Sequence, residues 1–405
     1  MRAAQLTREF PPEVYGGAGV HVEYLAAALD KHVDVAVHCF GAARDGPLVA
    51  ATYQPWEALE GSAPHLGALR TFSVDLAMAA GVEGADLVHS HTWYANLAGH
   101  LAKLLYDIPH VATTHSLEPQ RPWKAEQLGG GYALSTFAEG TALAAADAVV
   151  AVSERMRADV LASYPGVDPE RVVVIHNGID TAEYQSDPRT DVLTARGIDP
   201  DRPIVLFVGR ITRQKGITHL LDAAEHLAPE AQLVLCAGAP DTAALEAEVT
   251  DAVQRLRRQR EGVHWLAEML PRPDVVQLLS HTTVFVCPSI YEPFGLVNVE
   301  AMACGAAVVT SAVGGIPEVV VHGETGLLTP FEASGDAFGT PSDPDGFARR
   351  LAEQINTLVT DPALAAAYGD AGRRRVAEHF SWDAIAERTA GLYRQLVSAA
   401  TGSAV

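Results

Sequence analysis

Short apolar runs alternate with amphipathic stretches along almost the whole 405-residue chain, and this alternation restricts the fold more than any other feature. The apolar runs have the length of strands, and apolar residues recur at helical spacing in the segments between them. Such a pattern is typical of parallel sheets covered by helices on both faces. Strands are predicted at residues 3–6, 33–37, 86–89, 110–114, 148–152, 172–175, 204–208, 232–236, 284–287 and 307–310. The sequence therefore predicts an α/β fold of doubly wound sheets.

The strand–helix pattern restarts after Asp201, which predicts two domains that face each other across a cleft. The length agrees, since a domain takes roughly 150 residues. The stretch before the restart is polar and contains several X-Pro steps, which discourage helix continuation. We predict an N-terminal Rossmann-like domain at 1–180, a linker at 181–202, a C-terminal domain at 203–378 and a C-terminal helix at 379–405 that crosses back to the N-terminal domain.

The chain is acidic, with 29 Lys and Arg residues against 50 Asp and Glu residues and a net charge of −21. This balance argues against a nucleic-acid or anionic-membrane binder, which needs a basic face to displace phosphate counterions. Four scattered cysteines fit a reducing compartment, and no apolar run is long enough to span a bilayer. We expect a cytoplasmic protein that binds neither nucleic acid nor membrane; the sequence leaves the oligomeric state open.

Two cations follow the first predicted strand of the second half. That strand runs into Gly209 and Arg210, and Lys215 follows five residues later at a helix start. Ligands of such sheets bind at the carboxyl ends of the strands, so both side chains should face the cleft. Arginine offers a bidentate fork and lysine a compact charge, which together suit a diphosphate. A solvated loop with incidental charge is the alternative interpretation.

A loop and helix start follow the strand at 284–287. The helix should begin near Phe294, where the N–H groups of Gly295 and Leu296 would bind an anion. Glu300 lies about 7.5 Å further along the helix, an offset that suits ribose hydroxyls when a phosphate occupies the helix end. Glu292 precedes the helix and is left to face the group beyond the phosphates. Two solvated surface glutamates are the alternative interpretation.

In the first half, Gly16 and Gly17 follow the first strand and open a helix, which permits close backbone approach to a phosphate or sugar. His89 and His91 end another strand on the same side. A zinc site would need a third ligand at matching spacing, which the sequence lacks. We therefore predict no metal, and we expect His91 to polarise or position a substrate.

A local basic site follows the strand that His115 closes. Arg121 and Lys124 flank Trp123, and together they could hold a small anionic acceptor. The alternative is a surface loop whose Trp123 packs inward.

The order and spacing of these pieces resemble the retaining, nucleotide-sugar-dependent glycosyltransferases of the GT-B fold, specifically the bacterial glycogen synthase group. The resemblance covers essentially the whole chain. The motifs that carry it are Gly16-Gly17, His89-Ser90-His91, His176-Asn177-Gly178-Ile179-Asp180, Gly209-Arg210 with Lys215-Gly216, Glu292-x(7)-Glu300, Gly314-Gly315-Ile316-Pro317-Glu318 and Gly323-Glu324-Thr325-Gly326-Leu327-Leu328.

The segments 7–19 and 121–124 resemble the actinobacterial branch, whose members use ADP-glucose to glucosylate α-glucose 1-phosphate and make α-maltose 1-phosphate for α-glucan synthesis. Two departures from the classical bacterial glycogen synthases lie on the acceptor side. Val14 and Tyr15 stand where those enzymes have Lys before the Gly-Gly pair, and Thr92 stands where they have Asp. Both departures argue against polymer elongation and spare the donor site.

Residue by residue, the resemblance implies that Arg210 and Lys215 bind the donor diphosphate, that the Gly295 and Leu296 backbone binds phosphate, and that Glu300 binds ribose. Glu292 would contact the donor sugar hydroxyls and His91 the C6 region of that sugar. Gly16, Gly17 and Phe294 complete the implied donor site; His115, Arg121 and Lys124 form the predicted acceptor site. His91, Arg210, Lys215 and Glu292 are the predicted catalytic residues.

The resemblance implies ADP-glucose as a co-substrate without a separate cofactor or metal, and a small phosphosugar as acceptor. One alternative is a synthase that elongates α-1,4-glucan from ADP-glucose or UDP-glucose. A more remote alternative is a sugar-nucleotide epimerase with the same twin-domain architecture. A nicotinamide oxidoreductase is disfavoured because the glycine fingerprint is broken, with Val22 at the third glycine position.

Overall fold

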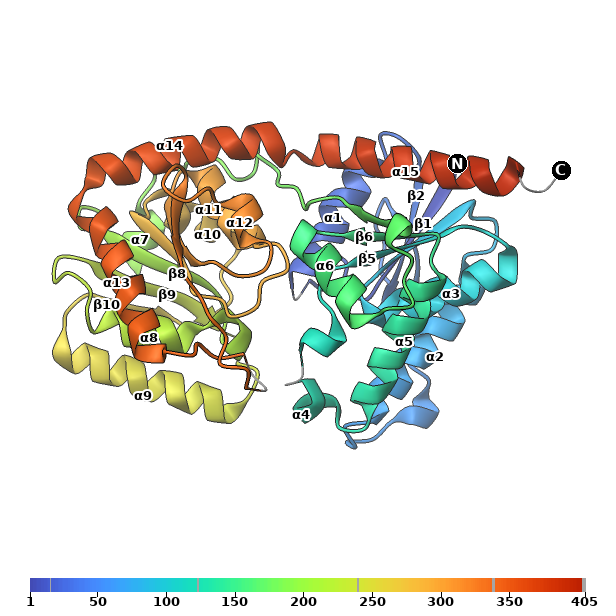
Figure 1. Ribbon diagram of the computed structural model, residues 1–405, viewed down its shortest axis with the longest axis horizontal. Helices are drawn as coiled ribbons and strands as arrows, with labels where there is room; N and C mark the ends of the chain where they lie inside the picture. The colour runs from blue at the N-terminus through green and yellow to red at the C-terminus, as the bar shows by residue number, and fades with distance from the viewer. Residues whose placement is uncertain (15, 122–123, 239, 337–338, 403–405) are drawn as a thin grey trace. The chain divides into compact units, whose positions relative to one another are not determined.

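The computed structural model describes residues 1–14, 16–121, 124–238, 240–336 and 339–402. The chain divides into two compact units. Unit 1 contains Met1–Gly178 and Trp382–Val405, and unit 2 contains Ile179–Ser381. Both ends of the chain therefore belong to unit 1 (Figure 1).

Unit 1 is built on a seven-stranded parallel sheet with the order β3-β2-β1-β4-β5-β6-β7. Its strands are β1 (Arg2–Thr7), β2 (Asp34–Phe40), β3 (Val49–Tyr53), β4 (Leu87–His91), β5 (His110–Thr114), β6 (Ala148–Ala151) and β7 (Val172–Val174). The order reverses between β1 and β4, because β2 and β3 extend the sheet on one side and β5 to β7 on the other. At this switch point the carboxyl ends of β1 and β4 bring Thr7 and His91 to one edge of the sheet, where ligands of doubly wound folds bind.

Helices surround this sheet on both faces (Figure 1). They are α1 (Gly17–Leu29), α2 (Leu66–Gly81), α3 (Trp93–Tyr106), α4 (Lys124–Leu128), α5 (Gly131–Ala145), α6 (Glu154–Ser163) and α15 (Trp382–Gly402). Helix α15 packs against α1, and its Trp382, Ile385 and Tyr393 join the apolar core on that face of the sheet. The prediction that the C-terminal helix returns to the N-terminal domain is confirmed.

Unit 2 is built on a six-stranded parallel sheet with the order β10-β9-β8-β11-β12-β13. Its strands are β8 (Ile204–Arg210), β9 (Gln232–Gly238), β10 (Val263–Leu266), β11 (Val284–Cys287), β12 (Ala307–Ser311) and β13 (Gly326–Thr329). Its helices are α7 (Asp191–Ala195), α8 (Ile217–Ala224), α9 (Ala243–Gln259), α10 (Arg272–Ser280), α11 (Leu296–Cys304), α12 (Ile316–Val319), α13 (Pro344–Thr360) and α14 (Pro362–His379). The order reverses between β8 and β11, the two strands that precede the predicted diphosphate residues and the Glu292 loop.

The predicted linker at 181–202 belongs to unit 2 instead of standing between domains. It contains helix α7, which packs against α10, and it buries Tyr184, Leu193 and Ile198 in unit 2. Polar residues and prolines dominate the composition of this stretch and outnumber its few buried apolar residues. Composition alone therefore predicts a linker. The boundary of unit 2 thus lies at Ile179 instead of residue 203.

All four cysteines are buried and none forms a disulfide. Among the helices of the described residues, none combines the length and apolar character that a membrane span requires.

Candidate active site

In unit 2, the predicted donor residues gather at the carboxyl ends of β8 and β11, where the strand order reverses. Arg210 is the last residue of β8, and its guanidinium lies 3.6 Å from a carboxylate oxygen of Asp241. Lys215 follows in a short 3₁₀ turn (Arg213–Lys215) that begins at Thr212, whose side chain accepts a hydrogen bond from the Lys215 amide. This cap fixes the backbone from which the lysine side chain projects.

Gly216 allows the Lys215 turn to press against the end of β11. Its φ of +64° lies in the left-handed region, and a Cβ at this position would stand 2.0 Å from the carbonyl oxygen of Pro288. A backbone hydrogen bond of 2.9 Å from Ile290 to Gln214 ties the two loops together. The sequence pair Lys215-Gly216 therefore works as a unit, because the glycine permits the approach that places the lysine.

Lys215 and Glu292 form an ion pair, with Nζ 2.6 Å from a Glu292 carboxylate oxygen. The same oxygen accepts a hydrogen bond of 3.3 Å from the Ser289 hydroxyl. Burial is the largest single influence and lowers the pKa of Lys215, but the charge and hydrogen bond of Glu292, together with Cys287, outweigh it. The pKa of Lys215 therefore lies above its usual value. Arg210 is close enough to repel the Lys215 charge. The structure thus brings the three predicted catalytic residues of this half into one site.

The Glu292 loop is held from the opposite side by the Gly314–Gly315 turn. The Gly315 amide donates a 3.0 Å hydrogen bond to the Glu292 carbonyl. Gly314 has a φ of +55°, and a Cβ there would stand 1.8 Å from the same carbonyl oxygen. Gly314 is therefore needed at this position, because a side chain there would clash with the backbone of Glu292.

Helix α11 begins directly after this loop, with Gly295 at its N-cap in the left-handed region (φ +98°) and Leu296 as its first residue. The first N–H groups of a helix have no intrahelical acceptor and attract anions. Asn298 adds a buried side-chain amide whose oxygen and nitrogen both lack a hydrogen-bond partner. Asn298 was not predicted as a site residue, since an asparagine inside a helix gives no distinctive signal in the sequence. The Phe294 side chain is 2% exposed and contacts Phe380, so it belongs to the core of unit 2.

Glu300 lies one helical turn further along α11 and is bonded to a residue that the sequence did not single out. The Tyr184 hydroxyl donates a 3.0 Å hydrogen bond to its carboxylate. Burial raises the pKa of Glu300 to about 7, while Tyr184, Arg272 and Lys215 partly oppose the rise. Lys215 is thus electrostatically coupled to Glu300 as well as Glu292.

Glu300→Gln should make the protein more stable than wild type above neutral pH. The folded protein keeps the Glu300 proton up to about pH 7, whereas the unfolded chain loses it near pH 4.5. Folding therefore binds a proton between these values, so wild-type stability falls as pH rises through this window. The variant lacks this penalty and should gain roughly 3 kcal/mol at pH 8 and nothing below pH 4.5. Urea unfolding at the two pH values tests this, with the exposed Glu353→Gln as the control; an equal gain at both pH values would contradict it.

In unit 1, Gly16 caps helix α1 and Gly17 is its first residue. The Gly16 amide donates a 2.9 Å hydrogen bond to Glu9. A Cβ at either glycine would meet no atom of the described chain within 4 Å. The start of α1 therefore has open space beside its backbone, as a phosphate or sugar contact requires. Tyr15 lies outside the described residues.

His91, the last residue of β4, is held by a chain of buried hydrogen bonds that reaches helix α15. Its Nε2 lies 3.0 Å from the Gln5 side-chain oxygen, and the Gln5 amide nitrogen donates to the Tyr393 hydroxyl at 2.9 Å. Tyr393 also bonds Nδ1 of His89 at 2.5 Å, and Nε2 of His89 bonds Thr113 at 2.6 Å. The Gln5 side-chain oxygen can only accept a hydrogen bond, so we place the His91 proton on Nε2. Nδ1 of the neutral ring then has a lone pair. Burial holds the pKa of His91 well below its usual value, so the ring is neutral.

Tyr393→Phe should destabilise unit 1 by about 1–3 kcal/mol, because it leaves buried polar atoms of Gln5 and His89 without their partner. Tyr106→Phe is a matched control, since the Tyr106 hydroxyl bonds a carbonyl in an exposed setting, and it should cost less than about 0.5 kcal/mol. Urea unfolding followed by circular dichroism measures both. Equal urea midpoints of unfolding for the two variants would show that the hydrogen bonds between His91, Gln5 and Tyr393 of α15 do not stabilise the unit.

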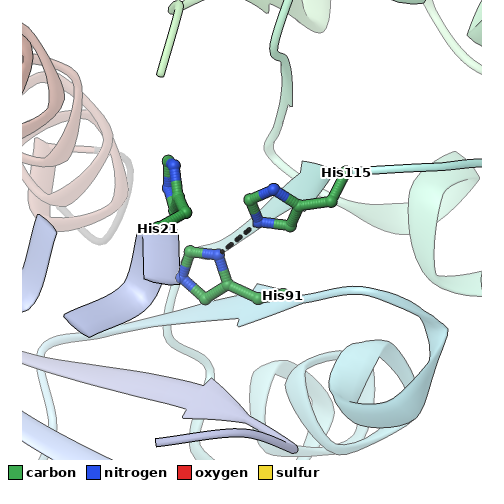
Figure 2. A group of neighbouring side chains, drawn as sticks. All are labelled: His21, His91 and His115. Atoms are coloured by element: carbon green, nitrogen blue, oxygen red, sulfur yellow. Dashed lines mark hydrogen bonds between the residues drawn. The ribbon is translucent and has the colours of Figure 1, made fainter. Parts of the chain in front are cut away.

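Three histidines of unit 1 converge at the carboxyl edge of the sheet, and their rings turn toward one another in Figure 2. His91 Nδ1 lies 3.1 Å from His115 Nε2, and His115 follows β5. His21 comes from α1; its Nδ1 lies 2.8 Å from the Asn177 side-chain oxygen, while its Nε2 is buried without a hydrogen-bond partner. Burial lowers the pKa of His21 to about 4. His21 and Asn177 were missed as site residues, because only the fold brings them to His91.

The predicted acceptor cations lie on a separate segment that follows β5. Arg121 lies 3.7 Å from the buried Glu118 carboxylate and donates a 2.9 Å hydrogen bond to Ser116. Arg121 therefore balances the charge of the buried Glu118 carboxylate. Lys124 opens helix α4 and is half-buried. Trp123, expected between these cations, lies outside the described residues, and the acceptor role of His115, Arg121 and Lys124 stays a prediction.

Two family models match the two halves of the chain. "Glycosyltransferase Family 4" matches residues 15–183, and "Glycosyl transferases group 1" matches residues 189–375. The division between the matches falls close to the boundary of the two structural units. Both models describe glycosyltransferases, in agreement with the resemblance of the sequence motifs.

Relatives of known name match over their full length. The α-maltose-1-phosphate synthase of Mycolicibacterium smegmatis is 57% identical over 98% of this chain and 100% of its own. The enzyme of the same name from Mycobacterium tuberculosis is 56% identical with the same coverage. Among solved structures, a sucrose-phosphate synthase from Thermosynechococcus elongatus matches with a TM-score of 0.76 and 27% identity over 98% of this chain and 100% of its own. The chain is thus a hexosyltransferase of the GT-B fold and belongs to the α-maltose-1-phosphate synthase family.

Proposed function

We propose that the protein transfers glucose from ADP-glucose to α-glucose 1-phosphate with retention and so makes α-maltose 1-phosphate. The observation that carries this proposal is the full-length identity of 57% to an enzyme named for that product. The unit 2 site supports the donor half, since it combines Arg210, Lys215, a helix start and two glutamates at a strand-order reversal.

The chemistry of donor cleavage suits these residues. Departure of the nucleoside diphosphate builds negative charge, and Arg210, Lys215 and the start of α11 are fixed groups that stabilise it. In this proposal they replace the divalent metal that other sugar transferases use at the diphosphate. Glu300 binds the ribose, Glu292 binds the sugar hydroxyls, and His91 contacts the C6 region of the sugar.

The Lys215–Glu292 ion pair adds a feature to this mechanism. When the diphosphate binds, Lys215 can exchange part of its interaction with Glu292 for the phosphate oxygens, which carry the charge that develops in the transition state. Glu292 is then released toward the sugar. Glu292 and Glu300 are not a glycosidase-type pair, because the ribose engages one of them.

Product analysis tests the proposal. Purified protein is incubated with labelled ADP-glucose and either α-glucose 1-phosphate or glycogen, and the products are separated by charge and size. We expect a phosphorylated disaccharide with the first acceptor and little label in polymer with the second. Label in glycogen alone would identify a glucan-elongating synthase, and faster reaction from UDP-glucose would overturn the ADP assignment. Nucleotide release that needs no acceptor would contradict transfer altogether.

A further inference from the structure

Unit 1 buries two glutamates that the mechanism above does not use. Glu118 lies in the turn after β5 and is 1% exposed, and Glu139 lies within α5 and is 2% exposed. The Glu118 amide donates a 2.8 Å hydrogen bond to a carboxylate oxygen of Glu139. Burying a carboxylate is costly, and an apolar side chain of similar size often stabilises a protein as well. What the glutamate adds is a fixed position for the backbone of the turn.

Two further contacts tie the same turn, residues 116–121, to α5. We call these residues the Glu118 turn. The Tyr132 hydroxyl donates a 2.6 Å hydrogen bond to the Glu118 carbonyl, and the Ser135 hydroxyl lies 2.7 Å from the Glu118 carboxylate. Both the backbone and the side chain of Glu118 are therefore bound to α5.

Glu139 is itself held by the segment that follows α6. The Tyr164 hydroxyl donates a 2.5 Å hydrogen bond to the same Glu139 oxygen that the Glu118 amide binds. Gly140 makes room for this tyrosine, because a Cβ at residue 140 would stand 2.9 Å from the Tyr164 ring. The Glu139 side chain thus connects the end of α6 to the Glu118 turn.

The Glu118 turn ends at Arg121, one of the cations predicted to bind the acceptor. The Arg121 amide donates to the Glu118 carbonyl at 2.9 Å, and its guanidinium donates to the Ser116 hydroxyl at 2.9 Å. The Lys124 amide in turn donates to the Arg121 carbonyl at 2.9 Å. The positions of both cations are therefore built on the backbone that Glu139 holds.

From these contacts we infer that Glu139 is a positioning residue for the acceptor. It holds the Glu118 turn so that Arg121 and Lys124 meet the phosphate group of a small phosphosugar in a fixed arrangement. Such preorganisation strengthens binding, because association then costs less conformational freedom. The inference rests on the proposed function, and it adds a residue too buried to touch the substrate itself.

The charges around Glu139 predict how acceptor binding depends on pH. The groups that interact with it are Glu118, Arg121, Tyr132 and Tyr164. Burial, reinforced by the charge of Glu118, raises the pKa of Glu139 to about 8. Burial also raises the pKa of both tyrosines, so their hydroxyls stay neutral in this range. Above about pH 8 Glu139 therefore adds a negative charge beside Arg121, which opposes the binding of an anionic phosphosugar.

Two replacements of Glu139 separate its hydrogen bonds from its charge. Glu139→Gln keeps an oxygen that can accept both bonds, whereas Glu139→Ala removes it. Initial rates are measured with each substrate varied while the other is saturating. At neutral pH, Glu139→Ala should raise the KM for α-glucose 1-phosphate by about 10-fold or more and leave the KM for ADP-glucose unchanged. Glu139→Gln should keep both wild-type values.

The pH profile gives a readout that a merely structural role would not change. As the pH rises through about 8, the wild-type KM for α-glucose 1-phosphate should increase, because Glu139 loses its proton. Glu139→Gln has no proton to lose and should show a flat profile over the same range. A wild-type acceptor KM in Glu139→Ala, or an equal rise of both KM values in that variant, would overturn the inference.

Val74→Ala is the control for loss of stability alone. Val74 is buried in the apolar core that α2 and α3 share with β1 and β4. Its truncation leaves a cavity that destabilises unit 1, but it should leave both KM values at their wild-type level. An acceptor KM raised equally in Val74→Ala would assign the effect of Glu139→Ala to stability and overturn the positioning role.

Hydrogen exchange measures the positioning without any substrate. Peptides of the Glu118 turn should exchange faster in Glu139→Ala than in wild type or Glu139→Gln, while peptides of α9 in unit 2 stay unchanged. Exchange that is the same in all three proteins, together with normal transfer by the wild type, would overturn this inference alone. A wild-type protein that does not glucosylate α-glucose 1-phosphate would instead overturn the proposed function and this inference with it.

Discussion

Replacing Lys215 with alanine should lower kcat by about 100- to 1000-fold while unit 2 remains folded. The side chain lies 2.6 Å from Glu292 and close to both Arg210 and Glu300, so its charge acts on the whole proposed donor site. Its pKa is raised, so it stays protonated across the neutral range. Loss of this cation removes stabilisation where the leaving diphosphate develops charge.

Steady-state release of nucleoside diphosphate, with circular dichroism as the check on folding, measures this effect. Lys31→Ala is the matched control, because Lys31 also forms a 2.7 Å ion pair, with Asp383, but its side chain is 63% exposed. Lys31→Ala should leave turnover unchanged. A folded Lys215→Ala protein with near-normal turnover would exclude the leaving-group role.

Gly314→Ala should reduce turnover by about 100-fold or more, because it displaces the loop that carries Glu292. The added methyl group would stand 1.8 Å from the Glu292 carbonyl oxygen, a separation that no side-chain rotation can relieve. The loop must therefore move, and a shift of about 1 Å at a reacting group is enough to cost two orders of magnitude in rate. The left-handed backbone at this residue adds about 1–2 kcal/mol of strain.

Gly323→Ala separates these two contributions. Gly323 has the same sign of φ, +77°, but a methyl group added there would meet no atom of the described chain within 4 Å. The variant should lose about 1–2 kcal/mol of stability and retain turnover. If both variants lose turnover equally, backbone strain alone is responsible and the contact with Glu292 is not.

The central strands and the edge strand β7 were predictable from the sequence, and the other three edge strands were not. The predicted ranges 110–114 and 284–287 coincide with β5 and β11, which are buried on both faces. The sequence of β11 is a continuous apolar run, and β5 is rich in the β-branched residues Val and Thr that strands favour. The missed strands β3, β10 and β13 all lie at sheet edges. They are short and largely half-buried, so their residues lack the apolar continuity that marks a strand.

Site residues divide in the same way. Arg210 ends β8, and the other three, Lys215, Glu292 and Glu300, lie in the turn, loop and helix that come after β8 and β11. The doubly wound pattern predicts that such strand ends meet. Asn177 follows β7, the last strand of unit 1, and bonds His21. Tyr184 precedes β8, the first strand of unit 2, and bonds Glu300. Both partners are more than 100 residues away along the chain, so no local spacing in the sequence reveals either contact. The histidine cluster shows the limit most clearly, since its members are separated by 70 and 24 residues along the chain.

Unit 1 contains α15 from the C-terminal end of the chain. This arrangement affects how the protein folds during synthesis. Ribosomes release domains for folding in order, N-terminal first. The first 178 residues emerge long before Trp382–Gly402, so unit 2 is complete while unit 1 still lacks α15. Until Tyr393 arrives, Gln5 and His89 have no hydroxyl to bind. The segment made first therefore depends on the segment made last, and a nascent chain stalled before residue 393 would lack the hydroxyl that Gln5 and His89 bond.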